Sequence, residues 1–171
     1  DDGYADANAV LYVAAGTGTL TINVEGHSAI RNTANNYALY MDRAVKLQSV
    51  SGASLDISVT GDYNAVYADV SLEAEDLVLS VTSSGGQPIH GSLSGCVLTF
   101  DNTQLTAQGA YGILSSTVVI KGGTDLSFSA TADVPNPELV LAVLDARVGL
   151  SFEGFTGTLQ VNSEVGFAVV A

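Results

Sequence analysis

The sequence predicts an all-β protein that folds as a right-handed single-stranded parallel β-helix, a solenoid of about six coils with three short strands each. Three observations support this fold class. The composition favours strands, a unit of strand, turn and strand recurs along the chain, and apolar and polar residues alternate within the strands. A coil of this kind buries its inner surface only when another coil stacks on it, so repetition is part of the fold.

The composition of the 171-residue chain suits short strands joined by turns. Apolar residues make up 47% of it, but only 7% are aromatic and none is Trp, while 18 residues are Gly and 3 are Pro. Aliphatic side chains must therefore fill the interior, with glycine at the turns. We expect residues 1–171 to form a single β-helix domain and to be a segment of a longer surface protein, because neither end shows an amphipathic cap.

Six segments of the chain share the order strand, small-residue turn, strand. They span residues 10–26, 45–61, 70–86, 97–109, 118–130 and 148–164. Their second strands carry leucines 21 to 35 residues apart, namely Leu20, Leu55, Leu77, Leu105, Leu126 and Leu159. We expect a third short strand between units, at 29–33 or 37–42, then at 64–69, 87–91, 111–116, 138–145 and 166–170. Three strands per period match one coil of a three-sheeted β-helix.

Alternation within the second strands predicts which side chains point inward. The apolar sets are Leu20, Ile22 and Val24; Leu55, Ile57 and Val59; Leu77, Leu79 and Val81; and Leu126, Phe128 and Ala130. The intervening residues are mostly Ser, Thr, Asn and Asp, which we expect to face water. Stacked coils then place like residues about 4.8 Å apart, in apolar rows inside and hydroxyl-bearing rows outside.

Two longer stretches, 26–44 and 130–149, interrupt the regular spacing, and we expect them to emerge as loops on one side of the solenoid. For the second stretch, the alternative is a short helix over 137–146. The competing fold is an antiparallel β-sandwich, which also has alternating strands. A sandwich does not require one three-part unit to recur in a fixed order, so the solenoid is preferred.

The formal charge of -13, from 5 basic and 18 acidic residues, argues against several partners. It repels phosphate backbones and anionic headgroups, so we expect no nucleic acid partner and no membrane insertion. No apolar run approaches the length that a membrane helix needs. Cys96 is the only cysteine, which leaves no intrachain disulfide, and we expect it to be a small buried hydrophobe.

Two stretches, LDISVTGDYNAVYADVSLEAEDLVLSVTSSGG at 55–86 and LTAQGAYGILSSTVVIKGGT at 105–124, carry a family resemblance. They resemble the repeats of β-helical carbohydrate-binding-domain-like proteins and adhesins on the surface of anaerobic Gram-positive bacteria. The shared unit is a strand, a Gly turn, a strand like Ala-Ile-Tyr-Ala and a turn like Gly-Gly-Thr, and it extends over most of residues 11–170. The resemblance implies a non-catalytic, extracellular cell-surface protein, an adhesin or polysaccharide-binding module. Its partner would be a polysaccharide or a host glycan, with no required cofactor and sometimes with bound calcium.

The middle strands of the repeats contain a candidate carbohydrate site. If their aliphatic residues point inward, an outward column forms from Tyr40, Tyr67, His90 and Leu114, with Asp42 and Asp69 at the next outward positions. Sugar rings pack on aromatic side chains, and sugar hydroxyls donate to carboxylates. The candidate ligand-binding residues are therefore Tyr40, Asp42, Tyr67, Asp69 and His90. The alternative is that tyrosines, which strands favour, pack only on their neighbours.

Calcium is the one metal that the sequence suggests. Asp62, Asp69, Glu75 and Asp76 fall at or near turns of adjacent coils, and stacking can bring such oxygens within the calcium shell of about 2.3 to 2.6 Å. Their spacing does not match an EF-hand loop. The alternative is a set of solvated turn carboxylates.

Two other function classes stay open, a polysaccharide lyase or glycoside hydrolase on this fold and a purely structural surface stalk. A hydrolase needs two carboxylates facing one cleft, and a uronate lyase needs a base and a cation beside the substrate acid. The cations are Arg31, Arg43, Lys46, Lys121 and Arg147, and none falls in a recognisable pattern with paired aspartates. We therefore expect no catalytic residues.

Overall fold

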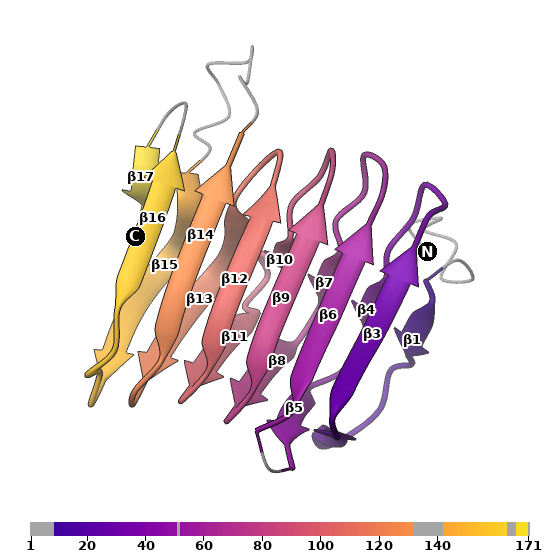
Figure 1. The fold of residues 1–171 in the computed structure, drawn as a ribbon, viewed down its shortest axis with the longest axis horizontal. Helices are drawn as coiled ribbons and strands as arrows, with labels where there is room; N and C mark the ends of the chain where they lie inside the picture. Colours follow the sequence, from indigo (N-terminus) through magenta and orange to yellow (C-terminus); the bar gives the residue numbers. More distant parts are fainter. Residues whose placement is uncertain (1–8, 51, 132–141, 164–166, 171) are drawn as a thin grey trace.

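The computed structural model describes residues 9–50, 52–131, 142–163 and 167–170, and over these ranges it contains strands and no helix. The chain winds into a parallel β-helix of six coils (Figure 1). In that view the chain rises along the front, crosses over the top to the back, descends and advances from right to left. This winding is right-handed, the hand that parallel crossovers favour. The predicted fold class is confirmed.

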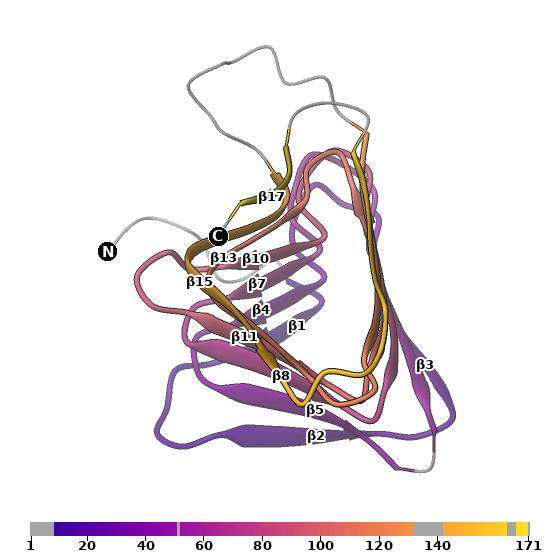
Figure 2. The same ribbon diagram turned by 90° about the vertical axis from the view of Figure 1, so that its left-hand side faces the viewer.

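The coils superpose along the axis into an outline with three faces (Figure 2). The first face holds β1 (Leu11–Val13), β4 (Leu39–Met41), β7 (Val66–Ala68) and β10 (Ile89–Gly91), and the second holds β2 (Leu20–Val24), β5 (Val45–Ser49), β8 (Ser71–Glu75) and β11 (Val97–Asp101). The third face holds β3 (His27–Asn32), β6 (Ser54–Val59), β9 (Val78–Ser83), β12 (Gln104–Gly109), β14 (Asp125–Ala130) and β16 (Leu159–Ser163). All neighbouring strands pair in parallel.

The last two coils differ from the others at the corner between the first and second faces. There β13 (Ile113–Lys121) and β15 (Ala142–Glu153) each run through the corner as one long strand, and β17 (Phe167–Val170) pairs with the start of β15. The register between β13 and β15 shifts after Ser115, so that Arg147 and Val148 lie opposite Ser116 alone. This is a β-bulge. Where three short strands were expected in each coil, each of these two coils therefore has one long strand and one of ordinary length, β14 or β16.

Residues in register on successive coils form columns, and the inward columns make the core. One column on the second face is Ile22, Leu47, Ala74, Phe100, Ile120 and Phe152. One on the third face is Ile30, Ile57, Val81, Ala107, Phe128 and Val161. Members in the middle coils are buried, because each is covered by a coil on both sides. The predicted alternation is confirmed for 55–59, 77–82 and 126–131.

The turn from the second face to the third has the same backbone feature in every coil. One residue in each turn has a positive φ, namely Gly26, Gly52, Asp76, Asn102, Gly122 and Gly154. This left-handed conformation costs little for Gly and is tolerated by Asn and Asp, whose short side chains hydrogen-bond locally. The Oδ1 atom of Asn102 also accepts a hydrogen bond from the backbone N–H of Gly123, in the turn of the next coil, at 2.9 Å. These turn residues therefore occupy the same position in all six coils, whereas the six predicted leucines do not.

Two of the predicted repeat positions are wrong. Leu20 was matched to Leu55, but Leu20 pairs with Val45 on the second face, and the residue that pairs with Leu55 in the first coil is Ser28. Leu77 is buried in the turn before β9, and Leu79 is the residue in register with Leu55. Strands on the second and third faces share one alternating pattern, so similarity alone does not say on which face a strand lies.

The two stretches expected as loops are mostly strand where the structure describes them. Residues 26–44 contain β3 and β4, which complete the first coil and open the second. Residues 142–149 belong to β15, so the helix considered over 137–146 is wrong for 142–146, and 137–141 lie outside the described residues. The parallel pairing throughout rules out the antiparallel sandwich.

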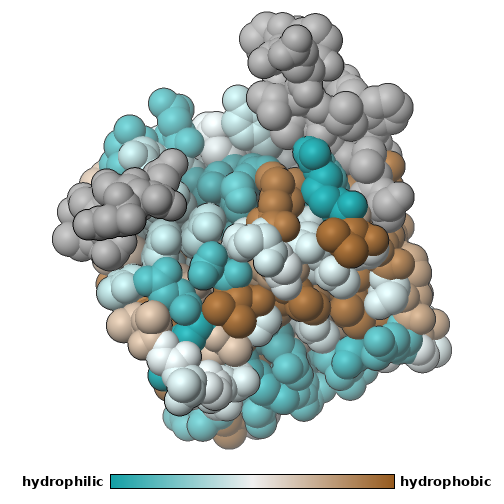
Figure 3. Space-filling view, turned by 180° about the vertical axis from the view of Figure 1, so that it is seen from behind, coloured by the Kyte–Doolittle hydropathy of each residue, from teal (hydrophilic) through white to brown (hydrophobic). Residues whose placement is uncertain are grey.

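The outer surface seen from behind is largely hydrophilic, with apolar side chains gathered across its middle and toward the C-terminal end (Figure 3). Exposed apolar residues at the corner between the first and second faces are Val70, Leu93 and Val148. Within the described ranges, no helix is long and apolar enough to cross a membrane.

Candidate functional site

An outward column of the first face carries the predicted aromatic residues. In register along the coils lie Tyr12, Tyr40, Tyr67, His90, Leu114 and Asp145. The alignment of Tyr40, Tyr67 and His90 is thus confirmed, and their inward neighbours Leu39, Val66 and Ile89 are fully buried. Leu114 has the predicted register but is buried, so it does not extend the exposed column.

The aromatic rings of this column stack along the solenoid axis. The rings of Tyr40 and Tyr67 are nearly parallel, with centroids 4.8 Å apart and planes 16° apart. Tyr12 lies 5.8 Å beyond Tyr40, and His90 lies 5.3 Å beyond Tyr67. Each tyrosine of the middle pair is therefore covered on both faces by its neighbours. A ligand would therefore meet the edges and hydroxyls of these rings.

A pocket of about 290 Å³ opens beside the column and is lined by Tyr37, Tyr40, Asn64, Tyr67 and His90. We call it the tyrosine pocket. Tyr37 packs edge-on against Tyr40, with ring centroids 5.1 Å apart, and lies 5.8 Å from Tyr67. The pocket combines apolar ring edges with a few fixed polar groups, as small-molecule sites do.

Sequence reasoning missed two residues of the tyrosine pocket, Tyr37 and Asn64. A signal for them was present. Placing YALYMD at 37–42 above NAVYAD at 64–69 puts Tyr37 in register with Asn64, three residues before the aromatic column. The residue three positions before an outward strand residue lies in the preceding turn, so the simple alternation rule did not include it.

Asn64 fixes the protonation of His90. The Oδ1 atom of Asn64 accepts a hydrogen bond from the backbone N–H of Gln87 at 2.9 Å, which orients the amide. Its Nδ2 atom then faces Nδ1 of His90 at 3.2 Å and donates to it. Nδ1 therefore carries no proton, and the neutral ring keeps its proton on Nε2. Burial lowers the pKa of His90 below its ordinary value, which also favours this neutral form.

Tyr67 also stays neutral, as a protonated phenol. Its burial raises the pKa of the hydroxyl above the ordinary value, and the nearby charge of Asp69 raises it further. A hydrogen bond with Ser92 opposes this shift in part. The hydroxyl of Tyr67 is thus protonated at neutral pH and can act as a hydrogen-bond donor or acceptor.

The two carboxylates predicted to accompany the tyrosines lie at the other ends of their strands. Asp42 follows β4 and Asp69 follows β7, and neither lines the tyrosine pocket. Asp42 accepts a hydrogen bond from the hydroxyl of Tyr12 at 2.5 Å. Neither carboxylate lines the tyrosine pocket, but each acts on the hydroxyl of a tyrosine of the column, Asp42 through its hydrogen bond with Tyr12 and Asp69 through its charge near Tyr67.

The four residues considered for calcium are not brought together. Asp62 lies in the turn between β6 and β7, Glu75 is ion-paired with Lys46, and Asp76 has the left-handed backbone of its turn. Over the described part of the chain, no group of three or more His, Cys, Asp and Glu side chains converges. This set gives no basis for a metal centre.

Cys96 is fully buried, as predicted. Burial raises the pKa of its thiol to about 11, although hydrogen bonds with Ser115 and Ser92 oppose the shift. The thiol is therefore protonated at neutral pH, and a protonated thiol is a poor nucleophile. Cys96 acts as a small packed hydrophobe beneath the corner of the fourth coil.

No protein-family model matches the chain, and neither does any curated protein or any solved structure at a significant level. What the fold and the site define is a class, a right-handed three-faced β-helix with an aromatic pocket on its first face.

Proposed function

We propose that the protein is a non-catalytic, extracellular glycan-binding module of the adhesin type, and that the tyrosine pocket binds a neutral sugar. The tyrosine pocket itself carries the proposal. Its volume of about 290 Å³ is at the small end of ligand sites, which suits one sugar residue or the end of a chain. The resemblance of the repeats to cell-surface carbohydrate-binding proteins supports the same function.

The chemistry of the lining favours a neutral hydroxyl-rich ligand. Tyrosine hydroxyls and the Nε2 proton of His90 can pair with sugar hydroxyls, and the ring edges contact the C–H surface of a sugar. No Lys or Arg lines the pocket, and the chain carries a net charge of -13, so an acidic sugar is disfavoured. Two cations of the neighbouring coils are engaged elsewhere: Arg43 donates a hydrogen bond to the carbonyl of Thr17, and Lys46 is ion-paired with Glu73.

A glycan array probed with the purified chain tests this function. We expect binding to neutral glycans, and at least a tenfold loss in affinity for Tyr37→Ala and Tyr67→Ala, or about 1.4 kcal/mol. Tyr111→Ala is the matched control, because Tyr111 is a half-buried tyrosine outside the pocket. Far-UV circular dichroism checks that each variant keeps its fold.

Three results would contradict the proposal. Equal glycan binding by Tyr67→Ala and Tyr111→Ala would remove the tyrosine pocket from the function. Ultraviolet-absorbing unsaturated products released from polygalacturonate would instead make the protein a lyase. A chain that neither binds nor cleaves any glycan would fit a structural stalk.

A further inference from the structure

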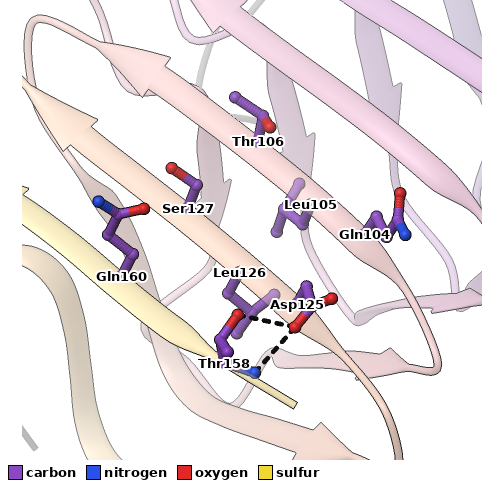
Figure 4. Close-up of a pocket in the computed structure, with 8 residues that line it drawn as sticks. All are labelled: Gln104, Leu105, Thr106, Asp125, Leu126, Ser127, Thr158 and Gln160. Atoms are coloured by element: carbon purple, nitrogen blue, oxygen red, sulfur yellow. Dashed lines mark hydrogen bonds between the residues drawn. The ribbon is translucent and has the colours of Figure 1, made fainter.

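The third face carries a second, unlike site on its last three strands, β12, β14 and β16. Two rows of polar side chains cross these strands, Gln104, Asp125 and Thr158 in one row and Thr106, Ser127 and Gln160 in the other. The rows are two residues apart along each strand, or about 6.6 Å. They border a pocket of about 180 Å³ on the outer surface (Figure 4). We call it the polar groove.

The side chains of the polar groove are largely unpaired with one another. Among the residues that line it, hydrogen bonds join only Asp125 and Thr158 (Figure 4). The same face is different at its other end. There Nδ1 of His27 lies 2.5 Å from the hydroxyl of Ser54, and Arg31 is ion-paired with Asp56 at 3.9 Å. Apart from Asp125 and Thr158, the polar side chains of the groove therefore keep hydrogen-bonding capacity for a ligand.

Asp125 is held in place before any ligand arrives. Its Oδ1 atom accepts hydrogen bonds from both the backbone N–H and the hydroxyl of Thr158, at 2.9 and 2.7 Å. Two donors on one oxygen fix the orientation of the carboxylate and leave Oδ2 directed to other partners. A preorganised acceptor loses less entropy when it binds a hydroxyl than a freely rotating side chain does.

We propose that the polar groove binds a neutral linear polysaccharide that runs along the solenoid axis, with one sugar residue over each coil. At about 180 Å³ the groove is smaller than the tyrosine pocket, so it encloses part of one sugar residue and the rest of the chain lies on the open surface above it. Successive coils are about 4.8 Å apart, which is close to the length of one sugar in an extended chain. A chain that lies over the two rows has the amide and hydroxyl groups of Thr106, Ser127 and Gln160 along one edge and Asp125 with its neighbours along the other. Because Asp125 is the charged residue of the lining, uronic acid and sulfated chains are disfavoured.

This site lies on a different face from the tyrosine pocket and uses different residues. The two sites can be occupied together, and a polysaccharide that reaches both gains avidity. The proposal therefore goes beyond the function assigned to the tyrosine pocket, and each can fail without the other.

The experiment is isothermal titration calorimetry of the purified chain with cellohexaose, mannohexaose and xylohexaose, and with hexagalacturonate as the acidic probe. Ser127→Tyr fills the polar groove from the middle of one row. Ser58→Tyr is the matched control, because both serines are half-buried outward residues of the third face. Tyr is favoured on strands, so both variants should keep the fold.

We expect at least one neutral hexasaccharide to bind, with affinity at least tenfold weaker for Ser127→Tyr and unchanged for Ser58→Tyr. If no neutral hexasaccharide binds, if Ser127→Tyr binds as well as Ser58→Tyr, or if hexagalacturonate binds more tightly, the polar groove is not this site. Tyr67→Ala, titrated in parallel, separates the two proposals. A loss with Tyr67→Ala alone would support the tyrosine pocket and overturn the polar groove, and a loss with Ser127→Tyr alone would do the reverse.

Discussion

Phe100 and Phe152 occupy the same column of the second face, yet their surroundings differ. Phe100, in the fourth coil, is fully buried, whereas Phe152, in the sixth, is 48% exposed. The same contrast separates Leu47 from Ile22 at the other end of the column. Along this column burial therefore depends on the neighbouring coils, and a residue is fully buried only where a coil covers it on each side.

The largest difference between two variants should be the one between Phe100→Ala and Phe152→Ala. We expect Phe100→Ala to lower the free energy of unfolding by about 3–5 kcal/mol, because it leaves a cavity between two coils. Phe152→Ala should cost no more than about 1 kcal/mol, because the exposed ring leaves no enclosed cavity. Urea denaturation followed by circular dichroism measures both. Equal costs would mean that the end coil is covered as well as the middle.

Replacing a left-handed glycine by alanine should have a smaller effect on stability, and the effect should be the same in the second coil as in the last. Gly52 and Gly154 have φ values of 70° and 59°, and an added Cβ would meet no atom within 4 Å at either position. Their replacement by Ala therefore adds only the cost of a left-handed residue, about 1–2 kcal/mol at each site. Unfolding free energies that differ between the two variants would show that turn strain also depends on neighbouring coils.

The pH dependence should separate the half-buried His90 from the exposed His27. Because burial lowers the pKa of His90 in the native state, the unfolded chain binds a proton more readily than the folded one. His90 thus has no effect above its unfolded pKa of about 6.5, and stability is lost as the pH falls through that value toward the lower native pKa. His90→Gln should remove this loss, and His27→Gln should keep it. Thermal melts between pH 7.5 and 5 provide the measurement, because this range lies on both sides of the ordinary histidine pKa of about 6.5.

The smallest effect should come from the exposed ion pair at the first coil. Arg31 and Asp56 lie 3.9 Å apart, and their side chains are 66% and 57% exposed. A double-mutant cycle with Arg31→Ala and Asp56→Ala should give a coupling within about 0.5 kcal/mol, since water and salt screen such pairs. A larger coupling would mean that the first coil is more enclosed than the exposure of its side chains indicates.

The fold could be predicted from the sequence because alternation is a local signal. Leu55, Ile57 and Val59 point inward in any β-helix, whichever face they occupy. The face on which each strand of the first coil lies could not be predicted from the sequence. The alternating pattern of Leu20, Ile22 and Val24 would be the same on the second face as on the third. Pairing partners are a long-range property, and the turn lengths that decide them vary from coil to coil.

The candidate site was predicted in part for a related reason. Tyr40, Tyr67 and His90 share a column because each has the same place in its strand. Tyr37 and Asn64 lie in turns, where no period-two rule applies. Asp42 and Asp69 do not line the pocket because they follow their strands, whereas Tyr37 and Asn64 precede them. Predicting this requires knowing where the chain turns.

The left-handed residue between the second and third faces has a consequence for how this molecule could change in length. Each coil has its own left-handed turn residue, its own inward residues and its own outward polar residues. No coil therefore depends on a distant one for its backbone geometry. Val66 pairs with Ile89, so a tandem duplication of residues 66–88 would extend every row by one member and leave each existing bend untouched. The solenoid could therefore lengthen by duplication of one coil, without a change in the sequence of the others.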